Sequence, residues 1–290
     1  MIQMSFATEI KNELCKNESD KNQLRLLCMG AVFAMNEDSG ILSFRTECKR
    51  AADHIEQAMT AINIPCKKSS VDIRGKKLYS VSLQKDSVDC ELPDCSDDDA
   101  FGIFLRGVFL VCGGAGDPEK GYQLEIFLHD ENKCKRLLSL IEEHGMSAKL
   151  STRRGSSFLY IKESEKISDI LTFMGAMMQA MEIMNIKIYK EVRNNVNRSV
   201  NCEAANLNKT VAAANIQADD IEYIFSTRGK SYLSEELLKV AEIRLDNREL
   251  SLSDIGEMLE PPISRSGVNH RLKRISEIAA MLRIEDGIKE

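Results

Sequence analysis

The sequence has no tryptophan, and phenylalanine and tyrosine together make up only 6% of its 290 residues. Sites that bind single-stranded nucleic acid or sugars by stacking depend on clustered aromatic side chains, so we do not expect such a site. No uncharged apolar run is long enough to span a membrane, since Arg106 interrupts the best one. The segment Met1–Lys16 carries charges early and lacks the apolar stretch of a signal peptide. We therefore expect a cytoplasmic protein with no membrane partner.

The chain also lacks any C-x-x-C pair, although it contains nine cysteines. Their odd number and scattered spacing argue against a disulfide framework and favour reduced thiols. The nearest pair, Cys90 and Cys95, has no matching second pair and no neighbouring histidine, so we expect no zinc site there.

Signatures of catalysis are equally scarce. The four histidines lie far apart, and neither a G-x-S-x-G nucleophile motif nor a phosphate-binding loop occurs. The glycine-rich segment Cys112–Gly116 follows a predicted helix rather than a strand and lacks the Lys-Ser/Thr pair of a phosphate loop, so we interpret it as a helix C-terminal turn. We expect no catalytic residue, metal, cofactor or small-molecule substrate.

What the chain does have is a normal globular composition with unevenly distributed charge. Hydrophobic residues make up 43% and charged residues 29%, typical of a folded protein with room for two domains. The formal net charge is -6, but Asp86–Asp99 alone holds seven acids and no base, which we interpret as a solvated linker. By contrast, Lys187–Thr210 has five bases against two acids and Pro262–Arg283 has five against one. An acidic chain with basic segments is compatible with a nucleic-acid partner.

Helical and strand patterns alternate as far as residue 185, and their order recurs. In the first half, Gln23–Met35 predicts a helix buried on several sides, Ile41–Thr46 a strand and Lys49–Ile62 an amphipathic helix. A hairpin follows around the turn Arg74-Gly75-Lys76.

The second half predicts the same order of elements. Ala100–Val111 predicts an apolar helix, Tyr122–Leu128 a strand, Asn132–His144 a helix, and Ala148–Ile161 a hairpin around Arg154-Gly155. The tripeptide Cys-Lys-Arg occurs at the start of both amphipathic helices, at positions 48–50 and 134–136. We therefore predict two α-β-α-β-β units, at about 20–85 and 97–184, packed as a pseudo-dimer in a domain covering 1–186.

The character of the chain changes near residue 187. The methionine-rich helix Leu171–Met184 is predicted to serve core or helix–helix packing. Beyond it, 187–230 is predicted to form linker helices, one of them Asn201–Asn215. Asparagine is a poor residue inside helices, so three side chains there are candidate contacts to phosphate or a partner: Asn206, Asn208 and Lys209.

Three helical segments in 231–290 predict an all-α helix-turn-helix domain. Ser234–Leu245 is the first, and Ser251–Leu259 opens with a Ser251-x-x-Asp254 capping box. The prolines of Glu260–Ile263 must end the second helix, and Ser264 caps a third that runs to about Leu282. The apolar seam of the third helix is spaced 4, 3, 4, 3: Val268, Leu272, Ile275, Ala279 and Leu282.

The opposite face of this last helix carries the side chains that predict DNA binding. Near its N-terminus, Arg265, Asn269 and His270 can reach base edges in a major groove. Lys273, Arg274 and Arg271 are better placed for phosphates. The alternative is a solvated face on a helical bundle. The full predicted DNA-binding set is Ser264, Arg265, Ser266, Asn269, His270, Arg271, Lys273 and Arg274.

Several segments resemble the WhiA proteins of Gram-positive bacteria, and the resemblance spans essentially the whole chain. They are Ser5–Leu14, Leu105–Leu110 with Asp117–Glu125 after it, Asn201–Thr210 and Pro261–Leu272.

The resemblance implies an α+β fold: a duplicated LAGLIDADG homing-endonuclease-like domain of α-β-β-α-β-β-α units, then an all-α helix-turn-helix domain similar to those of sigma factors. It also implies a nucleoid-associated transcriptional regulator linked to cell division, chromosome segregation and sporulation. The partners would be double-stranded DNA and RNA polymerase, a sigma factor or another regulator.

Nucleases of the LAGLIDADG fold need an acid at the end of each motif helix to hold Mg²⁺. Setting Gly30 and Gly107 on the first glycine of the motif places Met35 and Cys112 at those positions. Sulfur is a poor ligand for a hard divalent cation, so we predict a DNA-binding protein that is not an enzyme.

Two other hypotheses stay open. A shifted alignment would bring Glu37, Asp38 or Asp117 near the metal position, which leaves a metal-dependent DNA endonuclease as an alternative. The third hypothesis is a protein-interaction module without DNA binding, using the methionine-rich helix Met174–Met184 or the acidic stretch.

Overall fold

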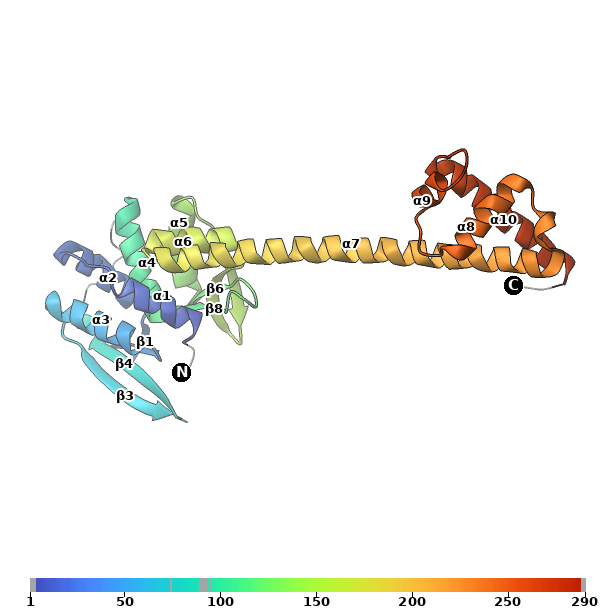
Figure 1. The fold of residues 1–290 in the computed structure, drawn as a ribbon. Coiled ribbons are helices and arrows are strands. Elements are labelled where there is room, and N and C mark those ends of the chain that lie inside the picture. The colour runs from blue at the N-terminus through green and yellow to red at the C-terminus, as the bar shows by residue number, and fades with distance from the viewer. Residues whose placement is uncertain (1–3, 74, 89–92, 94, 288–290) are drawn as a thin grey trace. The chain divides into compact units, whose positions relative to one another are not determined.

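The computed structural model describes residues 4–73, 75–88, 93 and 95–287. The chain folds as two units, Met1–Glu191 and Val192–Glu290, which are described separately (Figure 1). Some predictions fall outside the described residues: the Arg74 of the first hairpin turn, the Cys90 of the nearest cysteine pair, and Asp89, Glu91 and Asp94 of the acidic stretch.

The first unit contains two copies of one arrangement of helices and strands. After α1 (Phe6–Leu14), the first copy consists of α2 (Lys21–Ala34), β1 (Asn36–Asp38), β2 (Ile41–Thr46), α3 (Lys49–Ala61), β3 (Lys67–Ile73), β4 (Lys76–Gln84) and the 3₁₀ turn η1 (Lys85–Ser87). The second copy consists of α4 (Asp98–Cys112), β5 (Gly113–Ala115), β6 (Leu124–His129), α5 (Glu131–Glu143), β7 (Lys149–Arg153) and β8 (Ser156–Ile161), and α6 (Ser164–Met174) follows it.

The strand order confirms the predicted duplication and corrects its details. The antiparallel sheets run β1-β2-β4-β3 and β5-β6-β8-β7, so each strand has a counterpart in the other sheet. The repeat is α-β-β-α-β-β rather than the α-β-α-β-β predicted from hydrophobic patterning. The three-residue strands β1 and β5 are too short to show alternation, and the two glycines of β5 have low strand propensity. Interpreting Cys112–Gly116 as a helix turn was therefore wrong, because a strand begins at Gly113.

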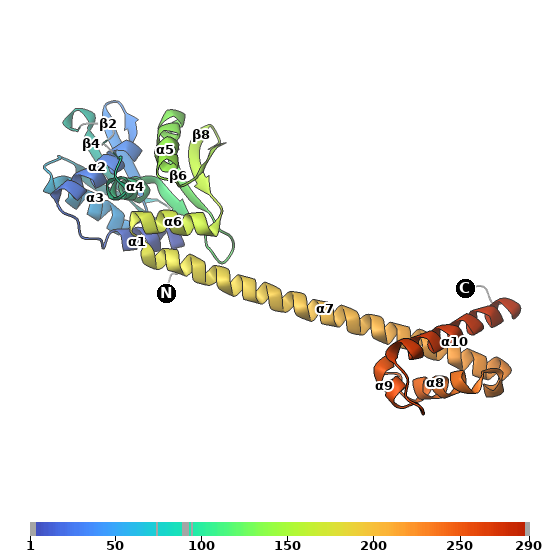
Figure 2. The same ribbon diagram turned by 90° about the horizontal axis from the view of Figure 1, so that it is seen from above.

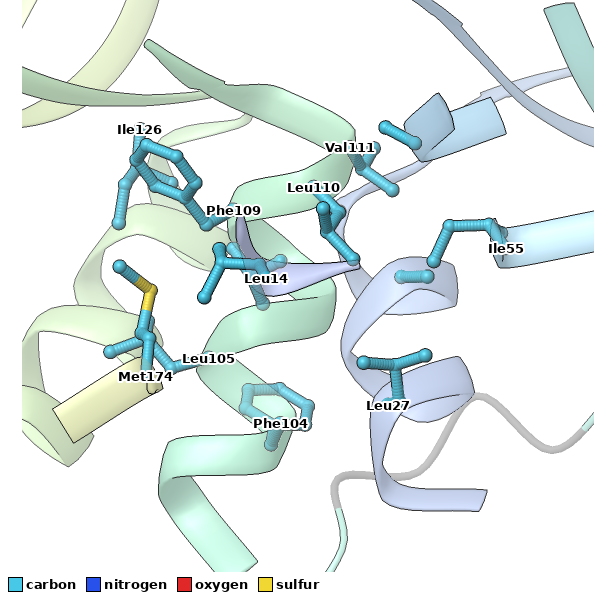
Figure 3. Packing of buried hydrophobic residues seen from close by; sticks show 14 of the residues in the cluster. Leu14, Leu27, Ile55, Phe104, Leu105, Phe109, Leu110, Val111, Ile126 and Met174 are labelled. Carbon is cyan, nitrogen blue, oxygen red and sulfur yellow. The ribbon is translucent and has the colours of Figure 1, made fainter. Parts of the chain in front are cut away.

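Helices α2 and α4 lie side by side at the centre of this unit (Figures 1 and 2). A Cβ atom on Gly30 would lie 2.0 Å from the carbonyl oxygen of Phe104, and one on Gly107 would lie 2.1 Å from that of Leu27. Each glycine thus faces the carbonyl three residues before the other glycine, and two backbones meet where no side chain fits. Figure 3 shows Leu27 of α2 and Phe104 and Leu110 of α4 among the buried residues of the surrounding core.

The predicted helix Leu171–Met184 is broken in the structure. Helix α6 ends at Met174, and Gly175 adopts the left-handed conformation, with φ of 90°, before α7 (Met177–Arg228) begins. The carboxylate of Glu13 on α1 accepts hydrogen bonds from the amides of Met178 and Gln179, at 2.7 and 3.0 Å, and so caps the start of α7.

The packing role predicted for the methionines is only partly correct. Met174 is fully buried, but Met177, Met178 and Met181 are 60%, 68% and 61% exposed. Helical spacing alone does not distinguish a face turned to the core from one turned to solvent.

The second unit begins on α7, which is one helix where separate linker helices were predicted. No glycine or proline interrupts Met177–Arg228, so the asparagines do not end the helix despite their low propensity. The remaining elements are η2 (Lys230–Tyr232), α8 (Glu235–Asp246), α9 (Leu252–Glu257) and α10 (Arg265–Glu285).

The core of the second unit joins the end of α7 to these helices. Ile221 and Ile224 of α7 are fully buried, and the whole predicted apolar seam of α10, from Val268 to Leu282, is buried as well. Arg283 of α10 donates to the buried carboxylate of Asp220 on α7 at 2.6 Å. The surface of α10 opposite the seam is therefore held in a defined orientation against this unit.

The α2–α4 crossing gives a direct test of the fold. Gly30→Ala places a methyl group against the backbone carbonyl of Phe104. A backbone atom cannot move away by changing rotamer, so we expect the free energy of unfolding to fall by about 1–3 kcal/mol or more. Gly121→Ala is the matched control, because a Cβ there meets nothing within 4 Å, and its effect should stay within about 0.5 kcal/mol. Urea denaturation measures both; equal stability of the two variants would contradict the close crossing.

Candidate nucleic-acid interface

Hydrogen bonds between residues close in sequence form the cap of α9 and the turn of the predicted helix-turn-helix. The capping box of α9 is confirmed: Ser251 Oγ accepts from the Asp254 amide at 3.3 Å, and an Asp254 carboxylate oxygen accepts from the Ser251 amide at 3.1 Å. Helix α9 ends at Glu257, before the prolines. The turn closes when the Ile263 amide donates to the Gly256 carbonyl at 3.0 Å. A Cβ on Gly256 would lie 2.3 Å from the Ile263 carbonyl oxygen, so this tight turn requires glycine.

Helix α10 begins where predicted, with Ser264 as its N-cap. Ser264 Oγ accepts from the Gly267 amide at 3.2 Å and lies 2.9 Å from Ser266 Oγ. The cap fixes the backbone of the first turn of α10, which carries Arg265.

Most of the predicted DNA-binding side chains are exposed on one face of α10. Arg271 is the exception, because it is partly buried and pairs with Glu236 of α8 at 3.1 Å. Arg274 pairs with Glu277 of its own helix, also at 3.1 Å. Within the described residues, the other polar side chains beyond the cap make no hydrogen bond or ion pair: Arg265, Asn269, His270 and Lys273.

A recess of about 480 Å³ joins this face to α7. Lys209 of α7 lines it together with Arg265 and Asn269 of α10 and Arg244 of α8. Of the residues that the structure describes, three bases and no acid line this recess. The structure therefore places Lys209, which was predicted as a possible additional contact, in the same recess as the predicted DNA-binding residues Arg265 and Asn269. Asn206 lies one turn away on α7, bonded to Cys202 Sγ and Thr210, and neither Asn206 nor Asn208 lines the recess.

Arg244 is the residue of this region that sequence reasoning missed. It is 2% exposed, and its Nη1 donates to the carbonyls of Leu250 and Arg248 at 2.8 and 3.3 Å, which anchors the loop before α9. Burial lowers the pKa of its guanidinium. The sequence feature that could have indicated the burial of Arg244 is its position, three residues after the apolar Ala241 on the buried face of the predicted helix.

The ends of α2 and α4 hold the positions where a nuclease of this fold needs acids. Met35, just past α2, is fully buried, and its carbonyl accepts from Lys133 Nζ at 3.0 Å. Cys112 is the last residue of α4, and burial raises the pKa of its thiol to about 12, so the thiol is protonated at neutral pH.

The acids nearest in sequence are engaged in other contacts. Glu37 pairs with Lys85 at 2.8 Å, and Asp117 bonds the Glu119 amide in an exposed turn at 3.0 Å. In the part of the chain that the structure describes, no group of histidine, cysteine, aspartate and glutamate side chains is arranged to hold a metal ion. None of the described helices is long and apolar enough to cross a membrane.

Two family models match the sequence, described as "WhiA LAGLIDADG-like domain" over residues 101–193 and "WhiA C-terminal HTH domain" over residues 196–279. A "Probable cell division protein WhiA" of Clostridium acetobutylicum is 35% identical over 316 residues, covering 97% of this chain and 99% of that protein. The protein of the same name from Staphylococcus haemolyticus is 33% identical over 313 residues, covering 99% and 100%.

Solved structures agree with these sequence relatives. Full-length WhiA from Thermatoga maritima superposes with a TM-score of 0.62 at 28% identity, covering 96% of this chain and 99% of that one. The N-terminal LAGLIDADG domain of WhiA has a TM-score of 0.54 at 22% identity over 60% of this chain and 92% of that one, which shows the fold. The chain thus has the predicted α+β fold, a duplicated LAGLIDADG-like domain followed by an all-α helix-turn-helix domain.

The N-cap of α10 can be tested by stability. Ser264→Ala removes the acceptor for the Gly267 amide, so we expect a loss of about 1 kcal/mol in free energy of unfolding. Ser266→Ala removes only an exposed hydroxyl contact and should cost less than about 0.5 kcal/mol. Denaturation of both variants, monitored by the circular dichroism of the helices, measures the two losses of stability. A Ser264→Ala variant as stable as the parent protein would show that the cap does not hold the helix.

Proposed function

The chain belongs to the WhiA family, and from that premise we propose that it is a DNA-binding regulator acting in cell division, with no catalytic activity of its own. The observation that carries the proposal is the exposed polar face of α10, whose Arg265, Asn269, His270 and Lys273 make no internal hydrogen bonds or ion pairs within the described residues. A basic helix that follows a tight turn and leaves polar side chains of its exposed face, among them Arg265 and Lys273, without internal partners is suited to a major groove.

The proposed roles follow from position along α10. Arg265, Asn269 and His270 lie in its first two turns and contact base edges, where arginine pairs with guanine and asparagine with adenine. Lys273 contacts phosphate, and Lys209 adds a phosphate contact from α7. Arg271 and Arg274 contact phosphate after leaving Glu236 and Glu277. The hydroxyls of Ser264 and Ser266 lie at the helix start, where phosphate oxygens are favoured.

The domain roles are proposed accordingly. Residues 231–290 are the DNA-binding domain, 187–230 link it to the nuclease-like domain, and 1–186 form a platform for DNA or protein. At the level of the cell, we propose a nucleoid-associated protein that controls transcription with RNA polymerase, a sigma factor or another regulator. Chromosome segregation and, in sporulating bacteria, sporulation are the further processes it would serve.

The absence of nuclease activity is part of the proposal. It is supported by a buried thioether at Met35 and a protonated thiol at Cys112, neither of which suits a hard divalent cation. It is also supported by the ammonium group of Lys133 on the Met35 carbonyl, because a cation there opposes the binding of a metal ion.

DNA titrations test the assignment of α10. Arg265→Ala and Asn269→Ala should weaken specific binding by about 1–3 kcal/mol, whereas Lys273→Ala should weaken binding to all duplexes alike. Genome-wide capture of bound DNA supplies the specific duplex, and titrations at one fixed salt concentration compare it with a scrambled duplex.

Lys239→Ala is the matched control for these variants, because Lys239 lies on α8 and pairs with Glu235 at 3.0 Å, outside the predicted set. Equal affinity of all the variants and the parent protein would remove α10 as the DNA-binding element. Capture of a polymerase or division protein without any DNA affinity would favour the interaction-module hypothesis.

A cleavage assay tests the absence of nuclease activity. Supercoiled and linear DNA incubated with the protein and Mg²⁺ or Mn²⁺ should stay intact, because the metal positions carry sulfur side chains. Clean cleavage that disappears in Asp117→Asn would establish the endonuclease alternative.

A further inference from the structure

A second recess, of about 350 Å³, lies in the first unit where α2 and α4 end. Both copies of the repeat line it: Asn36 and Arg45 from the first, Cys112, Phe127 and His129 from the second, and Lys11 from α1. Among the described residues, the only acid that lines it is Glu47, which pairs with Lys76 at 3.1 Å. The recess therefore has an excess of positive charge that its own residues do not balance.

Lys11 is the unusual residue of this recess. It is only 8% exposed, yet within the described residues its ammonium group makes no hydrogen bond and no ion pair. Its titratable neighbours are the thiols of Cys15, Cys48 and Cys112, and burial raises the pKa of Cys15 and of Cys112 to about 12, so those two are neutral. Burial also lowers the pKa of Lys11 itself.

A buried ammonium without a carboxylate is energetically costly, so an anion that enters from solvent would relieve the cost. Arg45 stands on the lining strand β2, is exposed, and also makes no hydrogen bond or ion pair with a described residue. Asn36 and His129 bring further groups able to donate hydrogen bonds. An ammonium and a planar guanidinium that line one recess are both groups that bind phosphate.

We propose that this recess binds a phosphate group, with Lys11 supplying the buried charge and Arg45 the forked hydrogen bonds. Two sources share this chemistry, a phosphodiester of bound DNA and a free phosphate ion or phosphorylated small molecule. The first source rests on the proposed DNA-binding function, and the second does not.

The test uses the full chain with Lys11→Met, Arg45→Gln and the control Lys135→Met. Lys135 is a surface lysine of α5, paired with Glu131 at 2.7 Å and absent from the recess lining. Arg45 is exposed, so its variant should fold even if Lys11→Met does not, and thermal melting checks all three variants.

The first arm measures the affinity for a duplex of arbitrary sequence across a salt series. Loss of one phosphate contact should weaken binding about tenfold and make the slope of log affinity against log salt shallower by about 0.9. The second arm measures the rise in melting temperature that inorganic phosphate causes, against chloride of equal ionic strength.

Each outcome supports or contradicts the proposed phosphate site. An effect of Lys11→Met and Arg45→Gln on the duplex arm alone supports the DNA phosphodiester, and an effect on the phosphate arm supports the free ion or small molecule. If the parent protein binds no DNA, the proposed function fails, while the phosphate arm still decides about the recess. Recess variants that match Lys135→Met in both arms overturn the proposal.

Discussion

The first unit depends on two backbones that approach each other where side chains are absent. Because Gly30 and Gly107 have no side chain, the backbones of α2 and α4 pack directly against each other. Each glycine faces the carbonyl group that lies three residues before the other glycine. The contact is reciprocal, and the two copies of the repeat that meet at it have sheets with equivalent strand orders. The ends of both helices also come together, which creates the recess that contains Cys112 and Lys11.

Much of this architecture was predictable because the hydrophobic patterns of the longer helices and strands extend over several periods. The seam of α10 runs through four full turns, and helical spacing identified every buried position from Val268 to Leu282. The strands β1 and β5 span three residues each, which is less than two periods of alternation, so no pattern could reveal them. The long α7 shows the opposite failure: a run of asparagines has low helix propensity, but nothing in the segment forces a break.

The candidate sites were predictable only where one helix supplies them. The face of α10 follows from its own periodicity, whereas the approach of Lys209 to Arg265 depends on how α7 packs against α10. Lys11 belongs to the same class. It is a charged residue in a short amphipathic helix and gives no sign of burial, and only the packing of α1 against the end of α4 makes it unusual. Contacts between distant segments cannot be deduced from local spacing.

The ion pairs of α10 have a consequence for the overall affinity for DNA. Glu236 and Glu277 pair with Arg271 and Arg274, so two of the cations that we propose contact phosphate are already engaged when no DNA is present. A carboxylate in such a pair acts as an internal competitor, and every duplex, of whatever sequence, must displace it before it gains that contact. Under the proposed contacts this lowers the affinity for random and for specific DNA by the same factor and leaves their ratio unchanged, whereas Arg265 and Asn269 have no internal competitor within the described residues. The acidic side chains of a DNA-binding domain can thus weaken its overall hold on DNA without changing which sequence it prefers.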